Sequence, residues 1–268
     1  KIKYTNNKRI NIYMNKNYLL PGEPLRKGVD LIADKKSGAL IVIGTSNKLD
    51  KISSGGINLK NCEYSPEMLS ELAKMDGAII VDESVSTILK ANVHLNPSDS
   101  LQTSETGTRH RTAERVSIET NLKVIAVSEE SSAIKVFHNM KVNELEAPAM
   151  ILGRVNESLQ SVDRMRRRFD EVLLELGELE IEDTITNQQV LTVIQRGELL
   201  TRLSNQVNNE AKNLGEEAGI VMIQSESLES GVENTMSLVL KDHLPSKKYR
   251  NIKKVKSEIS NLSYEELN

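Results

Sequence analysis

The chain has 268 residues, of which 38% are hydrophobic and 27% charged, with a formal net charge of −3 at pH 7. This length allows one large domain or two ordinary ones, and the composition is typical of a globular protein. The single cysteine, Cys62, excludes an internal disulfide and a cysteine-rich zinc site. Two Phe and no Trp argue against aromatic platforms for base stacking. No apolar run approaches the length of about 18 residues typical of a membrane span, and no secretory signal is found. We therefore expect a cytoplasmic protein that does not contact a membrane.

Helices and strands are predicted to alternate in the first part of the chain. Pro24 opens a helix that the apolar spacing extends to Lys36, and Ser65 caps another helix from Pro66 to Lys74. The other predictions are buried strands at 38–44 and 77–81, a loop at 53–56, an extended segment at 87–95, a surface loop at 96–106, a helix at 108–119, and a strand pair at 123–128 and 133–138. This pattern indicates an α/β domain over residues 1–147, with a mixed sheet flanked by helices and a leading segment, 1–23, that packs on the elements after it.

The pattern changes near Ala147-Pro148. Apolar residues then recur at three- and four-residue steps from Met150 to Leu179, which predicts one long amphipathic helix. Further helices are predicted at 186–213 and 228–240. We therefore expect an all-helical domain over residues 148–268, which serves as a linker for assembly.

Two short motifs carry the chemistry that the sequence suggests. Asp76-Gly77-Ala78 places a carboxylate on a tight turn where a strand begins, and Gly107-Thr108-Arg109-His110-Arg111 places cationic side chains at a helix start. A helix start with exposed N–H groups suits a polyphosphate, and a carboxylate can hold a divalent metal. Taken alone, the first motif is more often a plain turn and the second more often a solvated helix face than a site. Neither a Walker loop nor a GxGxxG loop follows a strand.

The residue identities of these motifs and their order along the chain resemble those of a known family. The matching stretches are residues 69–78, 91–95 and 107–115, together with 180–183 and 193–196. They resemble the bacterial diadenylate cyclases, in the branch that scans DNA integrity, and the resemblance runs from about Leu25 to Leu240. It implies that two ATP molecules are condensed into cyclic di-AMP with loss of two pyrophosphates, with Mg²⁺ or Mn²⁺ as cofactor.

The resemblance also implies roles for individual residues. Asp76 is expected at the ribose 3′-hydroxyl and the metal, Gly77 beside the nucleotide, and Leu95 at the adenine. The phosphates are expected at Thr108, Arg109, His110, Arg111, Thr112 and Ser128, with Asp76, Arg109, His110 and Arg111 as the catalytic set.

The family's architecture implies partners as well. Two cyclase domains face each other, each with one ATP, in a homo-octamer, and a helix–hairpin–helix domain binds branched DNA. The last glycine here is Gly231 and the chain stops at Asn268, so we expect a form that ends before that domain and binds DNA weakly or not at all. The lysines and arginine between 247 and 256 are interpreted either as a phosphate contact or as a solvated helix face. The alternatives to an enzyme are a DNA-sensing nucleotide-binding scaffold without catalysis and an assembly module without a ligand.

Overall fold

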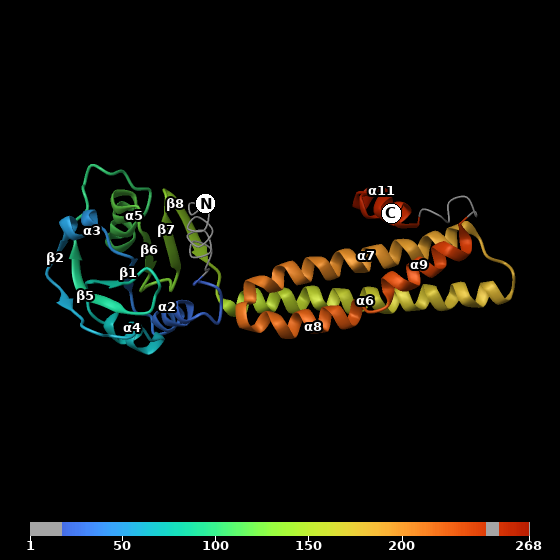
Figure 1. Cartoon of the computed structure of the whole chain (residues 1–268), viewed down its shortest axis with the longest axis horizontal. Helices are drawn as coiled ribbons and strands as arrows, with labels where there is room; N and C mark the ends of the chain where they lie inside the picture. Colours follow the sequence, from blue (N-terminus) through green and yellow to red (C-terminus); the bar gives the residue numbers. More distant parts are fainter. Residues whose placement is uncertain (1–17, 245–251, 268) are drawn as a thin grey trace, which may run out of the picture. The chain divides into compact units, whose positions relative to one another are not determined.

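The computed structural model describes residues 18–244 and 252–267. The chain divides into two compact units, Lys1–Ala147 and Pro148–Asn268. The first holds a mixed sheet with helices on both faces and the second is helical, which confirms the predicted fold class (Figure 1). Most of the predicted leading segment, residues 1–17, lies outside the described residues. Within its described part, Tyr18 and Leu19 pack on the core of the sheet.

The sheet has the strand order β2-β5-β4-β1-β6-β7-β8, and β3 pairs with β5. Among the strands of the described residues, only β1 and β4 pair in parallel, and the other pairings are antiparallel. Apolar runs without polar interruptions form the central strands, because these strands are covered on both faces. The strands are β1 (Ala39–Ile43), β2 (Ser53–Ser54), β3 (Ile57–Asn58), β4 (Ala78–Val81), β5 (Ile88–Leu95), β6 (Lys123–Val127), β7 (Ile134–His138) and β8 (Lys141–Leu145).

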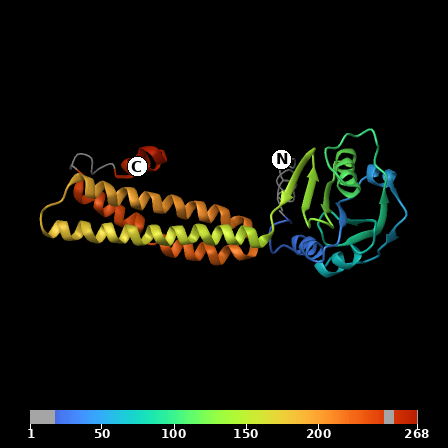
Figure 2. The ribbon, with the colours of Figure 1, turned by 180° about the vertical axis from the view of Figure 1, so that it is seen from behind.

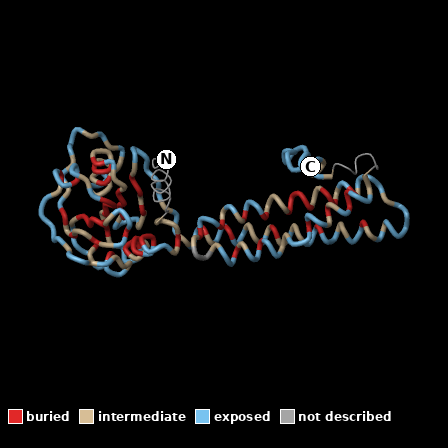
Figure 3. Tube along the Cα trace, in the orientation of Figure 1, coloured by how far each residue is buried: buried red, intermediate tan, exposed pale blue. Residues whose placement is uncertain are grey.

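Helices α2 (Pro24–Asp34) and α4 (Pro66–Leu72) lie on one face of the sheet, and α3 (Asn47–Ile52) and α5 (Thr108–Thr120) on the other (Figures 1 and 2). Each face has its own core. Leu25 and Leu69 pack against Ile41 on the first face. Ala113 and Val116 pack against Ala126 on the second. The buried segments in Figure 3 follow these strands and the inner sides of the helices.

Most elements predicted for this unit are confirmed, with three omissions, one of them the two-residue strand β3, and one error. The sequence interpretation missed α3, which is short and is capped by Ser46, whose Oγ accepts a hydrogen bond from Leu49 N at 3.1 Å. It also missed β8, an exposed edge strand reached through a two-residue turn in which Asn139 and Met140 both have positive φ. The predicted loop at 53–56 was partly wrong, because β2 pairs with the end of β5.

The start of β4 packs unusually closely on β5. Gly77 N donates a hydrogen bond of 3.1 Å to the side chain of Asn92, which has a left-handed backbone with φ of 55°. The register between the two strands shifts between Ala78 and Ile80, as at a β-bulge. A Cβ atom on Gly77 would lie 2.3 Å from Asn92 C and 2.7 Å from Val93 N. Only glycine therefore fits at this contact between two backbones.

The second unit is built on two long helices, α6 (Pro148–Ile181) and α7 (Asn187–Ala211). The segment after α7 forms η1 (Lys212–Glu217), α8 (Ala218–Glu229) and α9 (Val232–His243), and α8 and α9 pack one after the other along α7 (Figures 1 and 2). Two short helices, α10 (Ile252–Ser260) and α11 (Tyr264–Leu267), follow. The first two predicted helices are confirmed. The third, 228–240, was wrong in its bounds, because Gly231 at φ of 80° ends one helix and starts the next.

We expect Gly77→Ala to destabilise the protein by about 1–3 kcal/mol, because its Cβ would overlap backbone atoms that cannot move independently. Gly153→Ala is the matched control, since Gly153 lies in α6 and a Cβ atom there would have no neighbour within 4 Å. This control should be neutral or stabilising by about 0.5–1 kcal/mol. Urea denaturation of both variants measures the difference. Equal stability of the two variants would contradict the close approach of β4 to β5.

Candidate functional site

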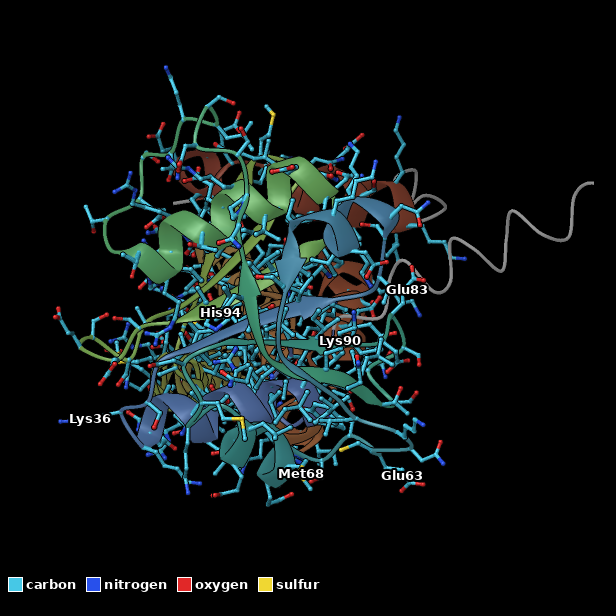
Figure 4. All side chains as sticks on the ribbon, turned by 90° about the vertical axis from the view of Figure 1, so that its left-hand side faces the viewer. Lys36, Glu63, Met68, Glu83, Lys90 and His94 are labelled. Carbon is cyan, nitrogen blue, oxygen red and sulfur yellow. The ribbon has the colours of Figure 1, made fainter. Side chains whose placement is uncertain are left out.

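The pairing of the strands brings four separate stretches to one edge of the sheet. Gly77 and Asp76 precede β4, and Gly38 precedes β1, which is parallel to β4. Leu95 ends β5 and Ser128 follows β6, and each of these strands is antiparallel to its central neighbour. In Figure 4, Lys36, before β1, and His94, near the end of β5, lie toward one side of the sheet, whereas Glu83, in the turn from β4 to β5, lies toward the other.

Asp76 lies in the bend between α4 and β4, and its side chain is exposed. In the part of the chain that the structure describes, no ion pair or hydrogen bond occupies its carboxylate. The neighbouring Gly77 is fixed against β5 by the contact with Asn92. The carboxylate therefore projects from a rigid strand start and is free to meet a ligand.

Helix α5 begins at the same edge, with an electrostatic pattern that is unfavourable without an anion. Its N-cap, Gly107, has φ of 78° and offers no side chain to the free N–H groups of the first turn. That turn has no acidic residue. It begins at Thr108 and continues with Arg109, His110 and Arg111, which add positive or protonatable side chains. The positive end of a helix dipole is stabilised by negative charge, and a helix start of this kind is a common phosphate site. The local sequence thus favours a bound anion over an isolated helix start.

The side chain of Arg109 lies over the start of β1. A Cβ atom on Gly38 would lie 1.9 Å from Nη1 and 2.3 Å from Cζ of Arg109, so the guanidinium occupies the space that any larger residue would fill. Arg109 and Gly38 are thereby brought together from elements far apart in the sequence. The contact places a cation on the strand edge that also carries Asp76.

His110 points to the face of the sheet. Its ring meets the ring of Phe137 on β7 edge-to-face, with centroids 6.4 Å apart and planes at 71°. Burial is the largest factor that lowers the pKa of the imidazole. Of the nearby charges, Glu105 and Glu144 raise this pKa, and Lys135 and Arg109 lower it. At neutral pH the ring is therefore in its neutral form, with one nitrogen as donor and the other as acceptor.

The remaining predicted residues differ in their surroundings. Thr108 and Arg111 are exposed at the start of α5, and Thr112 is half-buried. Ser128 begins the turn from β6 to β7, where its Oγ accepts a hydrogen bond of 3.2 Å from Ser131 N. Leu95 is half-buried, and it pairs with Ser53 of β2 while its side chain packs on the core. Five of the predicted residues therefore lie at one edge of the sheet: Asp76, Gly77, Leu95, Arg109 and Ser128. The ring of His110 contacts Phe137 on β7.

Three residues at the site were not found from the sequence. Gly38 is required by Arg109, and Glu105 and Lys135 form an ion pair beside His110. Neither apolar periodicity nor a motif marks these positions. The one signal in the sequence is Glu105, an acidic residue two positions before Gly107. Its negative charge is unexpected next to a segment suited to bind an anion.

Asp76 can contribute to a divalent cation site but cannot form one alone. Within residues 18–244 and 252–267, no group of three or more His, Cys, Asp and Glu side chains is placed to hold a metal ion. Mg²⁺ usually retains water and is bound through one or two carboxylates together with substrate phosphates. A single free carboxylate beside an anion site fits a cation of that kind, bound together with a nucleotide.

Two family models match this chain and define the class of protein to which it belongs. Residues 26–142 match the family model described as DisA bacterial checkpoint controller nucleotide-binding, and residues 145–268 match that of the DisA bacterial checkpoint controller linker region. The chain thus combines a nucleotide-binding domain with a helical linker region. Among the described residues, no helix has the length and apolar character needed to cross a bilayer.

Relatives of known name define the family. The DNA integrity scanning protein DisA of Kineococcus radiotolerans is 42% identical over 231 residues, which cover 86% of this chain and 64% of the relative. DisA of Acidothermus cellulolyticus is 38% identical over 252 residues, which cover 93% of this chain and 68% of the relative. DacA from Staphylococcus aureus, solved as a double mutant, is 25% identical at a TM-score of 0.40, over 56% of this chain and 97% of that chain. This chain belongs to the DisA family, and it spans about two thirds of the length of these DisA relatives.

We expect Gly38→Ala to weaken polyphosphate binding about tenfold or more without unfolding the protein. The new methyl group would displace the flexible end of Arg109, and a hydrogen bond to a charged group contributes about 1.5–3 kcal/mol. Calorimetric titration with inorganic triphosphate measures the affinity. In an Arg109→Ala background the same substitution should cause no further loss, because the cation is already absent. Additive losses in the double variant would show that Gly38 acts independently of Arg109.

Proposed function

We propose that this chain is a diadenylate cyclase, which condenses two ATP molecules into cyclic di-AMP and two pyrophosphates across a face-to-face pair of subunits. The observation that carries the proposal is the juxtaposition of a free carboxylate at Asp76 with an uncapped, basic helix start at Thr108–Arg111 on one sheet edge. Membership of the DisA family and the match to its nucleotide-binding model support it.

In each half-reaction the 3′-hydroxyl oxygen of one ATP attacks the α-phosphorus of the other. The bond from that phosphorus to the bridging oxygen of the β-phosphate breaks, pyrophosphate leaves, and the hydroxyl proton passes by way of the Asp76 carboxylate to water. Asp76 orients the 3′-hydroxyl, Gly77 lets the backbone approach the nucleotide, and Leu95 meets the adenine. A carboxylate is a weak base for an alcohol, so when Mg²⁺ or Mn²⁺ is bound by Asp76 and the phosphates, it supplies the acidity that the hydroxyl lacks.

The other residues bind the phosphates. Thr108, Arg109, His110, Arg111, Thr112 and Ser128 provide donors for the charge that develops during attack and for the leaving pyrophosphate. Arg109, anchored over Gly38, acts at the strand edge, whereas the exposed Arg111 is free to meet substrate held by the partner.

In the proposed reaction the site is completed by a symmetric pair of subunits. Each subunit binds one ATP, and the second subunit supplies the other substrate, so that assembly provides proximity. The helical unit holds the cyclase units in pairs, in a homo-octamer. Relatives carry the name DNA integrity scanning protein. We propose that the activity serves DNA-integrity scanning, with branched DNA as partner and the cytoplasm as location.

We expect Asp76→Asn to reduce cyclic di-AMP formation by about 10²–10⁴-fold, because the amide neither binds a cation as a carboxylate does nor accepts a proton. Mass spectrometry of the protein incubated with ATP and Mn²⁺ measures the product, and calorimetry measures retained ATP binding. Asp50→Asn, which alters an exposed carboxylate of the same unit, is the matched control and should remain active. Normal turnover in Asp76→Asn would remove this residue from the mechanism. Binding of ATP by the unaltered chain without product would favour the non-catalytic scaffold.

We expect the rate per subunit to fall steeply when the protein is diluted to monomers, since one subunit holds one substrate. Activity and mass are measured over the same concentration series, by product formation and light scattering. A rate per subunit that stays constant while the mass falls to that of a monomer would refute the two-subunit site.

A further inference from the structure

A partly buried ion pair lies immediately behind the start of α5. Lys135 Nζ is 3.1 Å from Glu105 Oε1 and 2.9 Å from Oε2, and the two side chains are 26% and 12% exposed. Lys135 pairs with Ala126 of β6, whose side chain lies in the core under α5, so Lys135 is on that face of the sheet. An ion pair that is shielded from water constrains its partners more strongly than a surface pair does.

Glu105 is the last anchored residue before the first turn of α5. The preceding segment is held along the helix: Leu101 O accepts a hydrogen bond of 3.0 Å from Arg115 Nε, and the Thr103 hydroxyl donates to the Glu114 carboxylate. Glu105 N then donates to Thr103 Oγ1 at 3.1 Å. Beyond it, the space around Gly107 is open. The place of the first turn is therefore fixed from the β7 side by the Glu105–Lys135 pair.

The same pair surrounds His110. The imidazole contacts Phe137, which is two residues along β7 from Lys135 and on the same face of the sheet. The charged groups that act on the ring come from every element around it: Glu105 from the segment before α5, Arg109 from α5, Lys135 from β7 and Glu144 from β8. Glu105 and Lys135 act on His110 with opposite signs. The intact pair thus adds little net charge at the ring.

We propose that Glu105 and Lys135 are a positioning pair, which ties the first turn of α5 and His110 to β7 in the arrangement that receives the phosphates of the nucleotide. This inference rests on the proposed function, because it takes the start of α5 as the phosphate site. Lys135 has a second effect within the pair, since it neutralises a carboxylate that would otherwise repel the polyphosphate.

The two members of the pair therefore differ in what their loss does. Lys135→Met leaves the Glu105 carboxylate unpaired beside an anion site, and we expect about tenfold weaker binding. Glu105→Gln leaves an unpaired cation there, so loosening of the turn is offset by attraction and the loss is smaller. The reversed pair, Glu105→Lys with Lys135→Glu, restores the tie and should recover most of the affinity.

The experiment uses the full chain and 3′-deoxy-ATP, which lacks the attacking hydroxyl and so reports binding without turnover. Calorimetry gives the affinities of the variants, and NMR titration of the His110 imidazole gives its protonation. The titration midpoint should move up in Lys135→Met and down in Glu105→Gln, because each variant removes one of the two charges that act on His110, whereas a loss of folding would not shift the midpoint in opposite directions. Lys90→Met, which removes a lysine of the same sheet paired with Asp50, is the matched control and should change neither quantity.

The outcomes separate the two proposals. If the unaltered chain binds 3′-deoxy-ATP, and Lys135→Met binds it as tightly with an unmoved His110 titration, the positioning pair is refuted and the cyclase site stands. If the unaltered chain does not bind the nucleotide, the phosphate site is refuted and the pair's role falls with it. Should Lys135→Met fail to fold, the reversed pair decides: its recovered affinity supports the proposal, and its failure to bind while folded overturns it.

Discussion

The parallel pairing of β1 with β4, inside a sheet that is otherwise antiparallel, is the constraint on which the site depends. It places the starts of both central strands at one edge, and the antiparallel neighbours β5 and β6 must then end there. Chain segments around residues 38, 76, 95 and 128 converge for this reason alone. The close contact of Gly77 with Asn92 holds the carboxylate-bearing turn against β5, so that the edge is rigid where the chemistry is proposed.

Electrostatics gives this edge its character. A helix start without a capping side chain and without acidic residues, followed by Arg109, His110 and Arg111, reduces the stability of the isolated helix and is favourable only with an anion. Proteins tolerate such local conflicts at functional sites. The surrounding structure supports this one by placing Arg109 over Gly38, His110 on Phe137, and a neutralised carboxylate at Glu105.

In the helical unit, arginines on the long helices secure the short ones. Arg166 of α6 donates from Nη1 to Leu228 O at 2.9 Å and to Ser230 O at 2.7 Å, at the end of α8. Arg202 of α7 does the same for α10, with Nη2 3.1 Å from both Ile259 O and Ser260 O. Helices of this length are marginal alone, and their last carbonyls need partners. The long amphipathic helices α6 and α7 thus organise the unit as well as supplying most of its core.

The sequence by itself determined the elements whose signals are local: the apolar strands β1 and β4, the proline- and serine-started helices α2 and α4, the long stripe of α6, and the basic start of α5. It did not reveal β8, whose residues are exposed at an edge, or the break at Gly231 within the helix predicted at 228–240. Only the tertiary structure decided that Arg109 lies over Gly38, and that Glu105 pairs with Lys135 beside His110. The physical reason is that these contacts follow from strand order and helix docking, which join residues far apart in the chain, whereas periodicity and capping report on near neighbours alone.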